Sequence, residues 1–219
     1  MYNSTLMTIR TSNKENGIYD LVVGIDLGVV RLATMVDTDG NVEFMDKGVV
    51  MGYCKEIERG HYKEEMLNIW LYSIANDYVK KWKIAGVEAV YIGCCKGDYL
   101  TLCGNKRNHP FYKYGVFEKL VRFFEQLCSK ENIHIEATSF DESYTSRANA
   151  LNSDYIPNHG DKNIPGFSGK RVMGQYIIDK NISINSDVNA AMNILHKAGF
   201  NIRVTVNCNL LEAIRHAKV

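Results

Sequence analysis

The sequence predicts an α/β domain in which helices flank a mixed five-stranded sheet, and three observations predict it. Asp39-Gly40, a dipeptide typical of hairpin turns, separates two runs of β-type residues. Residues 62–84 carry an apolar side chain at every fourth position, which is close to the period of a helix. Apolar runs at 87–92 and 133–140 then alternate with helical patterns. A meander followed by alternating helices and strands predicts a mixed sheet covered by helices.

The composition is that of a globular protein. The 219 residues are 46% hydrophobic and 23% charged, which is enough apolar material for a core without disulfides. Lys and Arg number 26 against 25 Asp and Glu, which excludes a polybasic arm or an acidic tail as the main functional part, although basic residues could still gather on one face. The sequence has no apolar run of membrane-spanning length, and residues 1–16 are polar, so no signal peptide is expected. Six cysteines without a Cys-x-x-Cys pair favour free thiols and a cytoplasmic location.

The first half of the chain is expected to open with three antiparallel strands, at 20–26, 29–37 and 42–50. The helix over 62–84 follows them. Its apolar stripe, and therefore its expected core face, consists of Met66, Trp70, Ile74, Tyr78 and Trp82. The strand at 87–92 is apolar throughout, as in strands that are buried on both faces.

The second half is expected to contain a helix over 113–129, a strand over 133–140 and a last helix over 187–197. Residues 141–184 lie between the last strand and the last helix. They show no clear period and are predicted to form a long irregular insertion. Loops of that length are uncommon unless they are functional.

This order of elements is that of the ribonuclease H-like fold, although other α/β domains share parts of it. We expect one domain over 1–199, with its insertion at about 141–184, and a tail over 200–219. The tail would add a strand at 202–206 and a short helix. Nucleases of this fold hold two divalent metal ions, about 3.5–4 Å apart, between carboxylates. Hard oxygen ligands are therefore expected at strand ends and at the start of the last helix.

Two aspartates stand at the ends of predicted elements. Asp26 ends an apolar strand between two glycines, where a charge is costly to bury unless it is paired or binds a metal. A turn aspartate that accepts backbone N–H groups would look the same. Asp187 opens the last helix, where it could bind a metal or simply cap the helix. Asn193 lies off the apolar face of that helix and could be solvated.

A third carboxylate is expected from a neighbouring strand, but the central strand ends at Gly93 without an acid. The nearest acid along the chain is Asp98, and the next strand is followed by Asp141 and Glu142. Because adjacent strands lie about 4.8 Å apart and a glutamate side chain is long, Glu142 could reach a site centred one strand away. Asp141 and Asp98 remain alternatives for the second ligand.

Four motifs occur in order along the chain. They are Gly-Ile-Asp-Leu-Gly at 24–28, Asp-Glu-Ser-Tyr-Thr-Ser at 141–146, Phe-Ser-Gly-Lys-Arg at 167–171 and Asn-Ser-Asp-Val-Asn-Ala-Ala-Met-Asn-Ile-Leu at 185–195. Together they resemble the RuvC-like nuclease domain of the transposon-encoded TnpB (OrfB) proteins. These proteins are RNA-guided DNA endonucleases related to type V CRISPR effectors. The resemblance covers residues 20–198.

The resemblance implies a ribonuclease H-like (RuvC-like) fold and cleavage of DNA at an Asp–Glu–Asp site with two Mg²⁺ ions, for which Mn²⁺ can substitute. Asp26 matches the first acid and Asp187 the third. The chain is similar to the branch that has Gly93 in place of the usual second acid, and there Glu142 is the relocated ligand. The implied catalytic and metal-binding residues are therefore Asp26, Glu142 and Asp187. The implied partners are target DNA and guide RNA.

Two further departures from the family bear on cofactors and partners. Most relatives carry a four-cysteine zinc ribbon before the last acid, whereas residues 147–184 contain no cysteine, so no zinc is expected. Relatives also carry N-terminal domains that hold the guide and the target, and only a short segment precedes the first predicted strand here. Another polypeptide could supply those domains, and no membrane is expected among the partners.

Basic and aromatic side chains near the proposed site could contact nucleic acid, by pairing with phosphates or stacking on bases. Each of them could equally be an ordinary surface or core residue. The expected nucleic-acid-binding residues are Lys96, Lys106, Arg107, Tyr144, Thr145, Ser146, Arg147, Lys170, Arg171 and Asn189.

The sequence thus predicts a Mg²⁺-dependent DNA endonuclease domain of TnpB type, RNA-guided in its complete form, that hydrolyses phosphodiesters with two metal ions. The alternative is a nuclease-inactive, nucleic-acid-binding remnant or subunit of the same family, because Gly93 replaces the usual acid. A ribonuclease H-like ATPase or kinase ranks below both, since the sequence shows no second Asp-x-Gly strand pair for phosphate.

Overall fold

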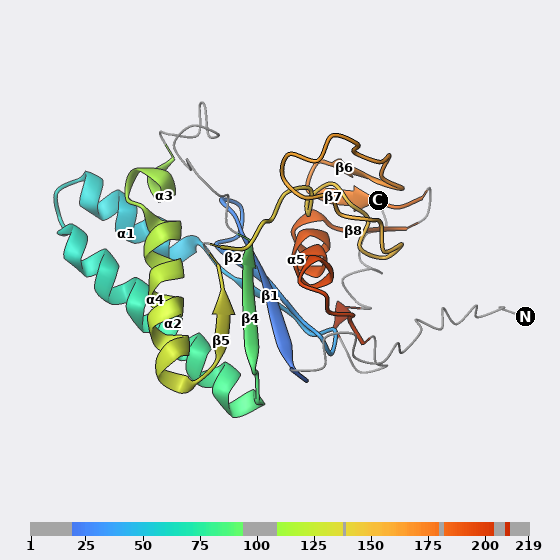
Figure 1. Cartoon of the computed structure of the whole chain (residues 1–219). Helices are drawn as coiled ribbons and strands as arrows, with labels where there is room; N and C mark the ends of the chain where they lie inside the picture. Colours follow the sequence, from blue (N-terminus) through green and yellow to red (C-terminus); the bar gives the residue numbers. More distant parts are fainter. Residues whose placement is uncertain (1–18, 94–108, 138, 180–181, 204–208, 211–219) are drawn as a thin grey trace, which may run out of the picture.

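A five-stranded mixed sheet is the frame of the molecule (Figure 1). Its strands are β1 Val22–Leu27, β2 Ala33–Asp37, β3 Val42–Met45, β4 Ala89–Gly93 and β5 His134–Glu136. They lie in the order β3-β2-β1-β4-β5. β1 and β3 each pair antiparallel with β2, while β4 is parallel to both β1 and β5. The structure, a computed structural model, describes residues 19–93, 109–137, 139–179, 182–203 and 209–210.

Helices cover both faces of this sheet (Figure 1). Those on one face are α1 Gly48–Glu58, α2 Glu64–Ala85, α3 Pro110–Lys113 and α4 Val116–Glu131. α5, Ser186–Lys197, lies on the opposite face against β1, β2 and β4. The strand order and directions are those of the ribonuclease H-like fold, so the predicted fold class is confirmed. Within the described ranges, no helix is long and apolar enough to cross a membrane.

Alternation along the central strands decides which side chains face α5. Val23 and Ile25 pack in the core beneath the four helices, whereas Val22 packs in a second core with α5. Side chains of a strand point to opposite faces in turn. Asp26 and Gly93, which are register partners on β1 and β4, therefore both face α5.

The strand predicted over 42–50 is wrong in its second half. β3 ends at Met45, and α1 begins at Gly48. Val50 is β-branched and favours strands. In the structure it is buried one helical turn before Cys54, and both side chains pack in the core of the helical face. Tertiary packing outweighs local propensity at this position.

The helix predicted over 62–84 is confirmed as α2, but its predicted core face is corrected by one position. Met66 is 42% exposed, and three other members of the predicted stripe are only partly buried, whereas Trp82 is buried as predicted. The buried side chains of α2 are Leu67, Leu71, Ala75, Val79 and Trp82. Both stripes are apolar, and the mostly aliphatic one is the one that packs inward.

The segment predicted as irregular, residues 141–184, contains a second, three-stranded antiparallel sheet. Its strands, in the order β6-β7-β8, are Lys170–Val172, Gln175–Ile177 and Ser183–Asn185. Each has three residues, too few for a period of two to be visible in the sequence. Elsewhere in this segment, the Asp154 carboxylate accepts hydrogen bonds from the backbone N–H groups of Asn149 and Ser168.

The remaining predicted elements shift only at their ends. The helices predicted over 113–129 and 187–197 are α4 and α5, and the strand predicted over 133–140 is shortened to β5. Of the predicted tail elements, the end of the strand at 202–206 and most of the short helix lie outside the described residues.

Gly24→Ala is expected to destabilise the protein by about 1–3 kcal/mol. A Cβ at Gly24 would stand 2.6 Å from the carbonyl oxygen of Ala191 and 2.8 Å from Leu195 Cγ. Because the first of these atoms is backbone, α5 as a whole would have to move away from β1. Urea unfolding measures the change.

The matched control is Gly52→Ala on α1, where a Cβ would meet nothing within 4 Å. That substitution should leave stability unchanged or raise it, since alanine favours helices over glycine. An equal unfolding midpoint for wild type and Gly24→Ala would contradict the close approach of α5 to the sheet.

Candidate functional site

Asp26 stands at the end of β1, the central strand of the sheet. The pKa of its carboxyl group is raised well above the ordinary value, first by burial and then by the negative charges of Asp187 and Glu142. The positive charge of Arg171 opposes this rise in pKa. Three carboxylates that are far apart in the sequence thus act on one another at this point of the sheet.

Glu142 comes from the loop after β5 and reaches across to β4. A Cβ at Gly93 would stand 2.6 Å from Glu142 Oε2, so the carboxylate occupies the space that a side chain at position 93 would take. Gly93 on β4 is the register partner of Asp26 on β1. The Glu142 carboxylate over Gly93 therefore lies next to Asp26. The strand without an acid therefore provides room for an acid from elsewhere.

Asp187 is the second residue of α5, but it is not the cap of that helix. The side chain of Asn185 caps the helix by accepting hydrogen bonds from the N–H groups of Asp187 and Val188. The Asp187 carboxylate accepts hydrogen bonds from Arg171 Nη2 at 3.1 Å and from Ser186 Oγ at 3.2 Å. The Asp187 side chain is therefore not used to cap α5, and it binds Arg171 from β6.

Asp141, the alternative to Glu142, is engaged in holding the loop. Burial alone would raise the pKa of its carboxyl, but the N–H groups of His159 and Ser143 and the ammonium of Lys197 donate to it and hold the pKa well below its usual range. The carboxylate that approaches Asp26 is that of Glu142. The other alternative, Asp98, lies outside the described residues.

Arg171 on β6 is the cation that pairs with the acidic cluster. Its guanidinium forms an ion pair with Asp187, and its side chain is 50% exposed. Lys170 beside it is exposed. A guanidinium group matches the geometry of carboxylates and of phosphates. Arg171 could therefore leave the Asp187 carboxylate and bind a phosphate instead.

Arg147, five residues after Glu142 in the chain, lies over two aromatic rings. Its guanidinium carbon is 5.6 Å from the ring centroid of Tyr144 and 5.4 Å from that of Phe167. Arg147 is exposed, and Ser146 is partly buried. These three side chains form a cationic and aromatic cluster.

Two of the predicted nucleic-acid-binding side chains belong to the scaffold instead. Thr145 and Asn189 are buried. Thr145 Oγ1 donates to the carbonyl oxygen of Glu142 at 2.9 Å. Asn189 donates to the carbonyl oxygen of Ala148 at 2.8 Å and accepts the N–H of Ala150 at 3.0 Å. Their polar atoms hold the loop, which corrects the expected contact with nucleic acid.

Three predicted nucleic-acid contacts fall on a part of the chain that the structure does not describe. Lys96, Lys106 and Arg107 all belong to 94–108, outside the described residues.

A polar stripe along α5 was not predicted. Asn189, Asn193 and Lys197 recur every four residues, and all three bind the loop after β5. Asn193 is buried and its Nδ2 donates to the carbonyl oxygens of Thr145 at 2.8 Å and Ala148 at 2.7 Å, so it is not the solvated side chain that it could have been from its place off the apolar face. The spacing of four on an otherwise apolar helix is the signal in the sequence that could have identified this stripe.

The three carboxylates fit a hard divalent cation in chemical kind, because such ions prefer oxygen ligands. As the side chains lie, no group of three His, Cys, Asp or Glu residues in the described parts of the chain is placed to hold a metal ion. One oxygen of Asp187 is paired with Arg171. Metal binding at these acids would therefore need Arg171 to leave Asp187 and the carboxylate side chains to draw together.

The strand order and the position of the acids define a ribonuclease H-like domain with an acidic site at the carboxyl end of β1. No family model and none of the curated proteins matches the chain. Among solved structures, the chain is similar to the Cas12f1 protein of a Cas12f1–sgRNA–target DNA complex, with a TM-score of 0.48 and 14% identity over 80% of this chain. It is also similar to RuvC of Thermus thermophilus, with a TM-score of 0.40 and 15% identity over 83% of this chain.

The two neighbours differ in how much of their length the chain spans. It covers 98% of the RuvC chain but only 49% of the Cas12f1 chain. Because the TM-scores are below 0.5 and the identities are 14% and 15%, we assign the fold from the topology of the sheet and not from these two solved structures.

Proposed function

We propose that this chain is the nuclease domain of a RuvC-like, divalent-metal-dependent DNA endonuclease of TnpB type. The observation that carries the proposal is the meeting of Asp26, Glu142 and Asp187, from the end of β1, the loop after β5 and the start of α5. Gathering like charges in a partly buried place costs folding free energy. Such an arrangement is more typical of a functional site than of a structural one.

The three carboxylates would hold two Mg²⁺ ions, with Mn²⁺ as a substitute. When bound, such ions activate a water molecule and stabilise the leaving oxygen of a phosphodiester. The chain's own cations have separate tasks. Arg171, once released from Asp187, would pair with a phosphate oxygen. Arg147 and its aromatic neighbours would stack against a nucleotide beside the site.

DNA as the target and RNA as the guide are supported by the four ordered motifs that resemble the TnpB family. In RNA-guided enzymes, base pairing reads the target sequence while the protein holds the backbone. We therefore propose that guide-binding parts, from this chain's full protein or from another polypeptide, act together with this domain.

A cleavage assay with labelled single-stranded DNA and Mn²⁺ or Mg²⁺ tests the proposal. Wild type should cut only when the metal is present. Glu142→Gln keeps the size of the side chain but removes its charge, and should lower the cleavage rate on the order of 100-fold or more. The matched control is Glu136→Gln, at a half-buried acid on β5, which should leave the rate unchanged.

Equal rates for wild type and Glu142→Gln would refute the assignment.

A second candidate function, nucleic-acid binding without cleavage, is favoured by the ion pair between Arg171 and Asp187. It predicts DNA binding that weakens steeply with salt, no cleavage, and no rise in melting temperature when Mn²⁺ is added.

A further inference from the structure

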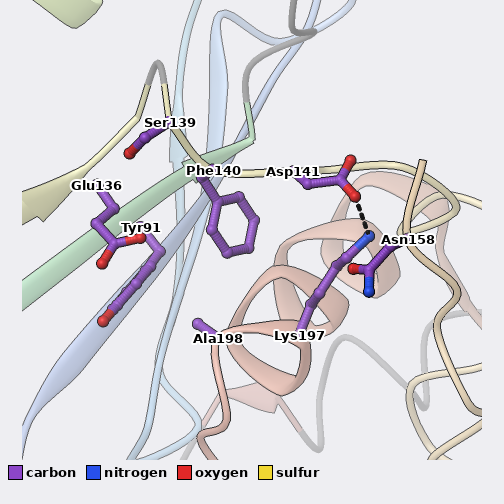
Figure 2. A pocket seen from close by; sticks show the side chains of 8 residues that line it. All are labelled: Tyr91, Glu136, Ser139, Phe140, Asp141, Asn158, Lys197 and Ala198. Atoms are coloured by element: carbon purple, nitrogen blue, oxygen red, sulfur yellow. Dashed lines mark hydrogen bonds and ion pairs between the residues drawn. The ribbon is translucent and has the colours of Figure 1, made fainter. Parts of the chain in front are cut away.

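Lys197, in the last turn of α5, makes several polar contacts through its ammonium group, and Figure 2 shows the one with Asp141. Its side chain is only 7% exposed. Its Nζ donates to Asp141 Oδ2 at 3.2 Å and to the carbonyl oxygens of Ser143 at 2.9 Å and Pro157 at 2.8 Å. A lysine ammonium has three N–H groups, so all three find an acceptor in the loop after β5.

These contacts lie on both sides of Glu142 in the chain. Asp141 precedes Glu142 and binds Lys197 through its side chain, and Ser143 follows it and binds Lys197 through its carbonyl. The Asp141 carboxylate also accepts the N–H of Ser143. The backbone around Glu142 is therefore fixed at both of its neighbours by one cation from a helix.

Glu142 needs such support more than the other two acids do. Asp26 and Asp187 belong to a strand and a helix, whose backbones are held by regular hydrogen bonds, whereas Glu142 lies in a loop. Functional groups on loops are placed less precisely than those on helices and strands unless further contacts hold them. The contacts of Lys197 with Asp141 and Ser143 hold the loop on both sides of Glu142.

A purely structural purpose is a weaker explanation for this lysine. Taking an ammonium and a carboxylate out of water costs free energy that their attraction often fails to recover. Apolar side chains in place of both Lys197 and Asp141 would avoid that cost. The charged pair gives instead a defined position to the loop.

We infer that Lys197 is a positioning residue, which through Asp141 and the Ser143 carbonyl holds Glu142 over Gly93. The inference rests on the proposed function in one respect, because that function gives Glu142 a metal ion to bind. One rigid helix of 12 residues then places two of the three acids. It carries Asp187 in its first turn and, through Lys197 in its last turn, fixes Glu142.

Hydrogen exchange by mass spectrometry and cleavage kinetics together test this inference. Lys197→Met, which keeps the apolar stem but not the charge, should speed amide exchange about tenfold in peptides covering 139–148, while α2 and α4 exchange as in wild type. It should lower kcat for DNA cleavage about 10–100-fold, with little change in KM. Lys197→Arg, which retains the cation, should recover most of both losses.

Two further variants keep the result decisive. Asp141→Asn leaves Lys197 in place and should also loosen 139–148, which covers the case in which Lys197→Met fails to fold. Lys81→Met removes an exposed lysine that pairs with Glu43, and should change neither exchange nor kcat. Unchanged exchange over 139–148 in both Lys197→Met and Asp141→Asn would overturn the inference.

Failure of the inference and failure of the proposed function give different results. If Glu142→Gln abolishes cleavage but Lys197→Met loosens the loop without lowering kcat, the positioning role is wrong and the nuclease assignment stands. If wild type neither cleaves DNA nor binds Mn²⁺, the nuclease assignment is wrong. The exchange data then decide alone whether Lys197 fixes the position of Glu142.

Discussion

Gly93→Ala is expected to lower metal-dependent cleavage about 100-fold at little cost in stability. A Cβ at position 93 would stand 2.6 Å from Glu142 Oε2 and 2.6 Å from Ile194 Cδ1. Both atoms are ends of side chains and can move, so the loss of stability should lie near the low end of the about 1–3 kcal/mol typical of overpacking. The carboxylate, however, must leave its place beside Asp26. A displacement of about 1 Å in a catalytic group can cost about 100-fold in rate.

A second substitution separates the two contacts of Gly93. Ile194→Val removes Cδ1 and relieves the contact with α5, but it leaves the contact with Glu142. If displacement of Glu142 causes the loss, the double variant Gly93→Ala/Ile194→Val should stay as slow as Gly93→Ala. Recovery of the rate in the double variant would show that movement of Ile194 is the cause, and full activity of Gly93→Ala would contradict the placement of Glu142.

Stability is expected to fall by about 3 kcal/mol between pH 7 and pH 4 because of His196 alone. Burial lowers the pKa of His196 from its ordinary 6.5 to about 4, and its Nδ1 has no hydrogen-bond partner in the described parts of the chain. The unfolded chain takes up a proton below pH 6.5, whereas the folded chain resists protonation until about pH 4. Acid therefore favours the unfolded state over this window, and stability is fully present above it.

Urea unfolding of wild type and His196→Leu at pH 7.5 and pH 4.5 measures this contribution. The variant should lose less stability on acidification, because it has no imidazole to protonate. His159→Leu, at an exposed histidine, is the control and should follow the wild-type pH dependence. Parallel pH profiles for wild type and His196→Leu would show that the folded protein accommodates the protonated ring.

The fold could be predicted from the sequence wherever the deciding pattern is local. The apolar runs of β1 and β4 and the helical spacing in α2 and α4 are of this kind. α1 was missed because its valines favour a strand until Val50 and Cys54 pack against the core. The sheet of β6, β7 and β8 was missed because pairing between strands of three residues is decided by contacts far along the chain.

The acids of the site could be predicted from the sequence, whereas the loop partners of the residues that hold them could not. Asp26 and Asp187 are marked by their places at element ends, and Glu142 by the distance between neighbouring strands. The space at Gly93 and the loop contacts of Asn193 and Lys197 involve partners that are backbone carbonyls or an empty volume. Such partners leave no residue type in the sequence that could reveal them.

The dispersal of the three acids along the chain has a consequence during protein synthesis. Asp26 leaves the ribosome before Glu142, and Glu142 before Asp187. Asp187 comes with α5, the helix that also packs on Gly24 and holds the loop of Glu142. A nascent chain that ends before α5 has neither the third acid nor the helix that places the second. The acidic site can therefore assemble only after α5 has been made.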